Sequence, residues 1–156
     1  MKKILILLLM LLISGQTVFA AQKTPIKIVP AENISTCYDE IQTGDKLLFQ
    51  VKNDVYVDKQ LIFKKGANVI GYVNFFCENG WGYDNAEITL NKFQLRNNEG
   101  KIVTINSEVT INGFEMLKTK GARFAQFFNY IGVVFRGKEI DIKHGVDNPE
   151  FVIWYY

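Results

Sequence analysis

Apolar and polar residues alternate with a period of two through much of this chain. In residues 47–51 every second residue is Leu, Phe or Val, and the same pattern returns in residues 86–95, 102–105 and 109–111. Alternation of this kind places the apolar side chains on one face of an extended strand. These segments are therefore predicted to be half-buried strands.

Residues 53–73 read NDVYVDKQLIFKKGANVIGYV and carry two such patterns around a Lys-Lys-Gly sequence. We expect consecutive strands here with a turn at Lys65-Gly66, because glycine readily adopts a positive φ. Gly71 lies inside the apolar run of residues 69–76, where a glycine indicates a bulge or a tight bend. Asp54 and Asp58 flank a strand without calcium-ligand spacing around them, which favours turn and capping roles over a cation site.

Turn residues separate these strands about every 8 to 12 residues, a spacing typical of an antiparallel barrel or sandwich. One segment differs, because the apolar residues of 121–135 recur with the period of a helix. The predicted fold is thus mainly β, a small antiparallel β-barrel or sandwich with one short amphipathic helix near residues 121–135. That helix would cover an open end or side of the barrel, or would make peripheral membrane contact.

The first residues have the pattern of a secretory signal: Lys2 and Lys3 precede an apolar run, and small residues end at Ala20. We expect residues 1–20 to be a cleaved signal peptide and the protein to reside in the periplasm or cell envelope. Residues 21–43, with two prolines, are expected to be an extended lead-in or a short edge strand. Residues 44–156 are expected to form a single β-barrel-like domain.

Charge gives no general reason for binding nucleic acid. The chain has 18 basic and 16 acidic residues, and two of the basic residues, Lys2 and Lys3, lie in the expected signal peptide. The remaining chain is formally neutral, so we expect no nucleic-acid partner.

Candidate chemistry is sparse. Cys37 and Cys77 are the only cysteines, and in an exported chain they either form a disulfide or remain two separate buried thiols. Two cysteines and one histidine do not make a zinc site. His144 lies in a predicted turn without a nucleophile nearby in the sequence, so a solvated turn residue is favoured over a general base. The sequence shows no phosphate-binding loop, metal cluster or nucleophile elbow, and we expect no catalytic residues, no metal and no cofactor.

Aromatic residues are the best candidates for recognition. Trp81 and Tyr83 lie in a predicted glycine-rich loop, and loops carry recognition more often than strands do. Trp154, Tyr155 and Tyr156 belong to the segment FVIWYY, which follows Pro149. An extended FVIWYY has apolar or amphipathic side chains on both faces, so it is either inserted between neighbouring strands, which we favour, or offered as an edge to a partner.

The order of short motifs resembles a known family. Gly44-Asp45, Asp54-Val55-Tyr56-Val57, Lys65-Gly66-Ala67 and Val69-x-Gly71-x-Val73 follow one another, with Gly80-x-Gly82 and Glu99-Gly100 beyond them. Over residues 40–106, and with a further strand pair in 137–156, this succession resembles the β-barrel core of the TrbI-like channel components of type IV secretion systems. Lys64 stands where that family usually has proline. The resemblance implies a related barrel and transfers neither channel activity nor catalytic residues.

Together these features predict an exported bacterial envelope protein that is not an enzyme and acts as a structural or protein-interaction module with an envelope protein partner. One alternative is an envelope ligand-binding protein or hydrolase whose site is dispersed along the sequence. Another is a small outer-membrane barrel, although charged residues interrupt most strands that would face lipid. The sequence does not determine the oligomeric state.

Overall fold

The structure, a computed structural model, describes residues 23–37, 41–80, 84–113 and 137–156. Strands contain 57% of these residues, and none of them is helical. The prediction of a mainly β fold is confirmed. The helix predicted at residues 121–135, and with it the membrane contact, lies outside the described residues.

The strands follow the alternating segments of the sequence. In chain order they are β1 (Thr24–Pro30), β2 (Ile34–Ser35), β3 (Lys46–Val51), β4 (Val55–Val57), β5 (Gln60–Phe63), β6 (Asn68–Cys77), β7 (Glu87–Arg96), β8 (Ile102–Asn112), β9 (Asp141–Ile142) and β10 (Phe151–Tyr155).

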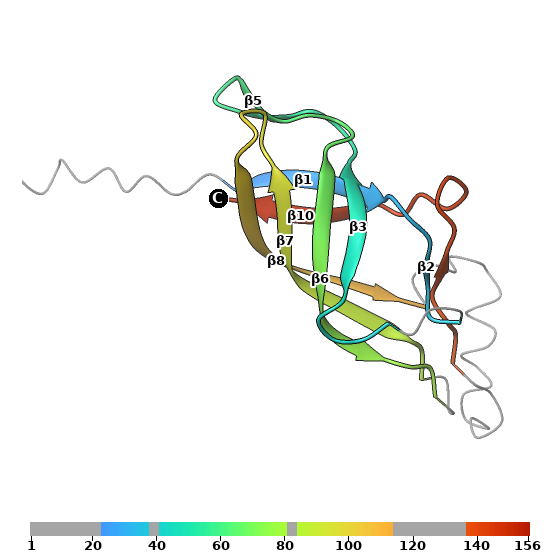
Figure 1. Cartoon of the computed structure of the whole chain (residues 1–156). Coiled ribbons are helices and arrows are strands. Elements are labelled where there is room, and N and C mark those ends of the chain that lie inside the picture. Colours follow the sequence, from blue (N-terminus) through green and yellow to red (C-terminus); the bar gives the residue numbers. More distant parts are fainter. Residues whose placement is uncertain (1–22, 38–40, 81–83, 114–136) are drawn as a thin grey trace, which may run out of the picture.

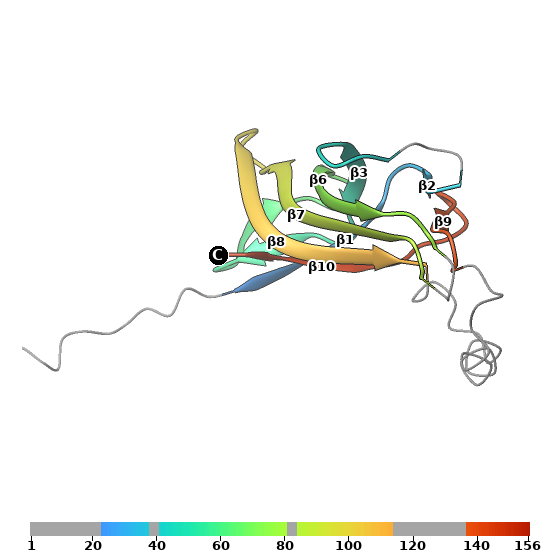
Figure 2. The same ribbon diagram turned by 90° about the horizontal axis from the view of Figure 1, so that it is seen from below.

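Six strands form one antiparallel sheet in the order β10-β1-β3-β6-β7-β8. In Figure 1, β1 and β10 cross behind β3 and β6, and the view from below in Figure 2 shows the two pairs as separate layers. β8 curves from the upper layer to the lower one, where it lies beside β10. The sheet is therefore a nearly closed barrel.

Bulges produce this curvature. The register of β6 and β7 shifts on both sides of Val73, and the register of β7 and β8 shifts between Leu90 and Lys92. A bulge increases the local twist and bends a strand, so shifts at neighbouring positions bend the strands together (Figure 2). The sequence predicted a bulge or bend at Gly71, and the first register shift follows it directly, between Tyr72 and Val73.

The barrel interior is filled by apolar side chains from every strand of the main sheet. Phe49 and Phe93 are fully buried and pack edge to face, with ring centroids 6.4 Å apart. Phe49 also packs edge to face on Phe151 of β10, at 6.0 Å. Gly71 lies beneath these rings, since a Cβ atom built on it would come within 3.0 Å of Phe93 and 3.1 Å of Phe49.

Residues 21–43, expected as a lead-in or short edge strand, contribute more than that. β1 pairs with β10 through Thr24–Ile28 and with β3 through Ile28–Pro30, so it lies inside the sheet. Its inward residues Ile26 and Ile28 are fully buried. The two pairings cover different halves of β1, so most of its residues have a partner strand on one side only. Prolines are tolerated at such positions because their missing N–H can face the unpaired side.

The hairpin β4–β5 packs over one end of the barrel (Figure 1). Its Phe63 is fully buried and packs edge to face on Tyr155, with ring centroids 5.5 Å apart. The predicted turn at Lys65-Gly66 is confirmed: Gly66 has a φ of 80°, and the carboxylate of Asp54 accepts the N–H of Lys65 at 2.7 Å.

A second small sheet, β2–β9, lies toward the other end (Figure 1). Ile34 and Ile142 form one of its pairs and are buried. The Thr36 hydroxyl donates to the carboxylate of Glu139 and accepts the N–H of Ile140 at 3.0 Å. These bonds fasten the chain leaving β2 to the chain entering β9.

A stability prediction follows from the turn between β4 and β5, whose two residues Asp58 and Lys59 have φ values of 49° and 66°. A two-residue hairpin turn with both φ values positive strongly favours glycine at its second position. Replacing Lys59 by glycine should therefore raise the free energy of unfolding, by up to about 1 kcal/mol in urea titrations.

The matched control is Lys65→Gly, because Lys65 has no positive φ to relieve. That variant should lose stability through the entropy of the unfolded chain. Equal or lower stability of Lys59→Gly relative to the parent would contradict the assigned turn strain.

Candidate interaction site

β10 uses its two faces differently. Ile153 is fully buried, and Phe151 and Tyr155 point to the same side, against Phe49 and Phe63 respectively. The inner side of β10 is thus buried, but the strand pairs only with β1 and ends the sheet, so the favoured insertion between two neighbouring strands is not what the structure shows. Of the residues proposed for recognition, Tyr155 is assigned to the interior side.

The other side of β10 is apolar and accessible. Val152, Trp154 and Tyr156 retain 36%, 42% and 62% of their surface exposure. Pro25 is exposed on β1 directly opposite Trp154, and the two stand side by side in the register. We call Pro25, Val152, Trp154 and Tyr156 the β10 face.

Lysines border this face. Lys27 pairs with Val152 across the two strands, and the ammonium of Lys23 lies 5.0 Å from the ring centroid of Tyr156. At the start of β10 the carboxylate of Glu150 binds both Lys27, at 3.4 Å, and Lys52. The hydrogen bonds from Lys52 and then Lys27 lower the pKa of Glu150 from its ordinary value.

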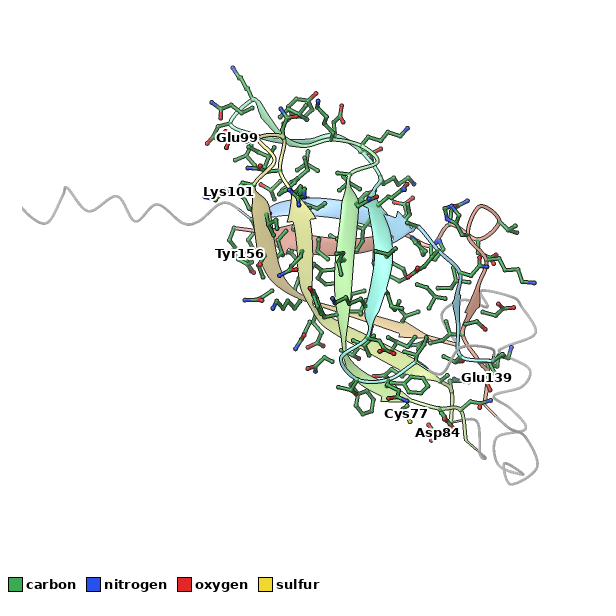
Figure 3. The ribbon with its side chains drawn as sticks, in the orientation of Figure 1. Cys77, Asp84, Glu99, Lys101, Glu139 and Tyr156 are labelled. Carbon is green, nitrogen blue, oxygen red and sulfur yellow. The ribbon has the colours of Figure 1, made fainter. Side chains whose placement is uncertain are left out.

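The β10 face lies away from the cysteines. Figure 3 shows Tyr156 at the same end of the barrel as Lys101, the residue that precedes β8, and Cys77 at the other end.

Cys37 is exposed after β2 and Cys77 is half-buried at the end of β6, and their sulfur atoms are not bonded to each other. Trp81 and Tyr83 lie outside the described residues.

His144 occupies the turn that the sequence predicted. It is exposed, its backbone N–H donates to the side chain of Asn33 at 2.8 Å, and its Nδ1 lies 3.1 Å from the carbonyl oxygen of Pro30. These contacts give the residue a structural role between the turn and the end of β1.

Within the described ranges no three His, Cys, Asp or Glu side chains are grouped so that they could hold a metal ion. Nor does any helix in that part of the chain have the length and apolar character needed to cross a bilayer.

Three of the four residues of the β10 face could be predicted from the sequence. Alternation in FVIWYY places Val152, Trp154 and Tyr156 on one side, as the structure does. It could not indicate Pro25 or the surrounding lysines, because these meet β10 only through pairing between distant parts of the chain. The two prolines of β1 were the one signal in the sequence that this strand is paired along only part of each side.

No family model, no curated protein and no solved structure matches the chain.

The Glu150 site generates a pH prediction. Because the folded-state pKa of this carboxyl is lowered, its contribution to stability is present above the pKa of the unfolded chain and is lost as pH falls through the lowered folded-state pKa. Glu150→Gln should be less stable than the parent at neutral pH, and the difference should shrink in acid. The contribution is small, since the group is at the surface.

Urea titrations of both proteins across this pH range provide the measurement. Glu99→Gln is the control, because this substitution removes the same charge. Glu99 forms no ion pair in the part of the chain that the structure describes. A stability difference for Glu150→Gln that grows as pH falls would overturn the assigned ion pairs.

Proposed function

We propose that this protein is an exported, non-catalytic interaction module of a bacterial envelope, and that a partner protein binds the β10 face. The observation that carries the proposal is the row of exposed apolar residues on a strand whose other side is locked into the core. Aromatic residues are enriched where proteins bind each other, because they bury a large area with little loss of side-chain entropy.

The rigidity of β10 favours this use. Phe151 and Ile153 hold the strand in the barrel, so Trp154 is presented from a fixed backbone and binding costs little ordering. The lysines at the border would form the polar rim that surrounds most interfaces. Export to the periplasm or cell envelope rests on the signal-like residues 1–20.

We also propose that the barrel is related to the TrbI-like barrels. In support, the motifs that carry the resemblance lie at turns and within strands of the barrel: Gly44-Asp45 directly before β3, Lys65-Gly66 in the turn before β6, and Gly71 within β6. Under this proposal the chain provides a barrel that assembles with envelope proteins, and the family offers no catalytic residues to assign.

Site-specific photo-crosslinking tests the interaction directly. Benzoylphenylalanine replaces Trp154 in the full-length protein, which is expressed in its source bacterium and irradiated. We expect a covalent adduct with another envelope protein, because the substituted ring lies on the β10 face.

The control places the same group at Tyr56, which is also an exposed aromatic residue but lies on the β4–β5 hairpin. Melting curves of both variants establish that each is folded. No adduct from position 154, or the same adduct with equal yield from position 56, would refute the proposed site.

A further inference from the structure

The outer surface of the upper layer carries a second feature that the β10 face does not include. Lys46, Tyr72 and Lys92 stand directly opposite one another on β3, β6 and β7. The next outward row consists of Leu48, Ile70 and Gln94, also in register. We call these six residues the β6 face, and none of them is acidic.

Two ammonium groups share one aromatic ring on the β6 face. The Nζ atoms of Lys46 and Lys92 lie 5.8 Å and 5.2 Å from the ring centroid of Tyr72. These distances limit the separation of the two nitrogen atoms to about 11 Å, so both ammonium groups lie near one ring and a single bound anion can meet both.

Among the described residues, neither Lys46 nor Lys92 has an acidic oxygen within 4.0 Å. Two acids at the border accept hydrogen bonds from backbone groups: Asp45 accepts the N–H of Gln42 and Glu32 accepts the N–H of Leu48, each at 2.7 Å. The two ammonium groups therefore form no ion pair within the described part of the chain and remain available to a partner's carboxylates.

The polar groups of this face are donors. The Tyr72 hydroxyl donates to the amide oxygen of Gln94 at 2.7 Å, which leaves the NH₂ group of Gln94 available to donate. Together with the two ammonium groups it forms a set of donors, whose complement is a group with only acceptor atoms, such as a carboxylate.

The neighbouring row adds an apolar requirement. Leu48 remains 41% exposed, and Ile70 beside it is half-buried. Residues two apart on a strand lie about 6.5 to 7 Å from each other on the same face. An extended peptide has the same repeat, so an acidic residue and an apolar residue two positions apart would match the two rows.

We propose that the β6 face binds an extended, acidic segment of a partner protein that runs along the strands, with a carboxylate at the row of Lys46 and Lys92 and an apolar side chain at the row of Leu48 and Ile70. Stacking of nucleic-acid bases is disfavoured, because the Tyr72 ring is already engaged by two cations. The inference rests on the proposed function as an interaction module, but it uses a different layer of the barrel from the β10 face.

Fluorescence anisotropy with residues 21–156, the chain without the expected signal peptide, tests this inference. The probe is a short labelled peptide that repeats Glu-Ser-Leu-Ser, so that Glu and Leu lie two positions apart on one face of the extended chain, and its counterpart has Gln in place of Glu. We expect binding of the Glu peptide only, weakened by salt. Lys46→Gln combined with Lys92→Gln should lower the affinity about tenfold, as loss of two surface charge pairs implies.

The matched control combines Lys64→Gln with Lys65→Gln, which removes the same charge from exposed positions away from this face. It should bind as the parent does. Equal binding by the Lys46/Lys92 variant, or an equal loss in the control, would refute the site. Tighter binding of a single-stranded oligonucleotide or phosphatidylglycerol vesicles through the same two lysines would also refute it, in favour of another class of ligand.

The two proposals fail separately. If the peptide does not bind but the adduct at position 154 still forms, only the proposal for the β6 face is refuted. If the peptide binds but that adduct does not form, the proposal for the β10 face is refuted and the proposal for the β6 face is not.

Discussion

The packing of Phe49 against two other rings is the contact on which the rest of the barrel depends. Phe49 of β3 packs edge to face on Phe93 of β7 and on Phe151 of β10, so one side chain joins both layers of the barrel. Gly71 lies directly beneath it, and the absence of a Cβ atom there leaves space for the rings of Phe49 and Phe93. A fully buried phenylalanine contributes roughly 1.5 to 3 kcal/mol through its area alone.

This interior arrangement determines what the outside can do. Since strand residues alternate between faces, fixing Phe151 and Ile153 inside requires Val152 and Trp154 to face outward. In the same way, burying Phe49 and Leu47 turns Lys46 and Leu48 to the surface. The β10 face and the β6 face are thus the outer sides of strands whose inner sides form the core.

Much of this could be predicted from the sequence because the period-two signal is local. Residues 47–51 and 86–95 are strands as expected, and Gly66 occupies the turn expected of it. Pairing was not predictable in the same way. The neighbours of β1, which are β3 and β10, depend on contacts between the two ends of the chain, and the turn at Asp58-Lys59 uses positive φ values at residues that rarely adopt them. Both surface sites are built across such pairings, so only the side chains from one strand of each could be anticipated.

The free energy of unfolding of Gly71→Ala tests the central role of this contact most directly. Gly71 has no positive φ, so alanine is acceptable to the backbone, and the rings of Phe49 and Phe93 are the side chains that the added methyl group would approach most closely. The account predicts a loss of about 1 to 3 kcal/mol in urea titrations, as in other overpacked cores, while the control Asn74→Ala, exposed on the same strand, remains close to the parent. Unchanged stability of Gly71→Ala, or the gain of about 0.4 to 1 kcal/mol usual where alanine fits without strain, would contradict it.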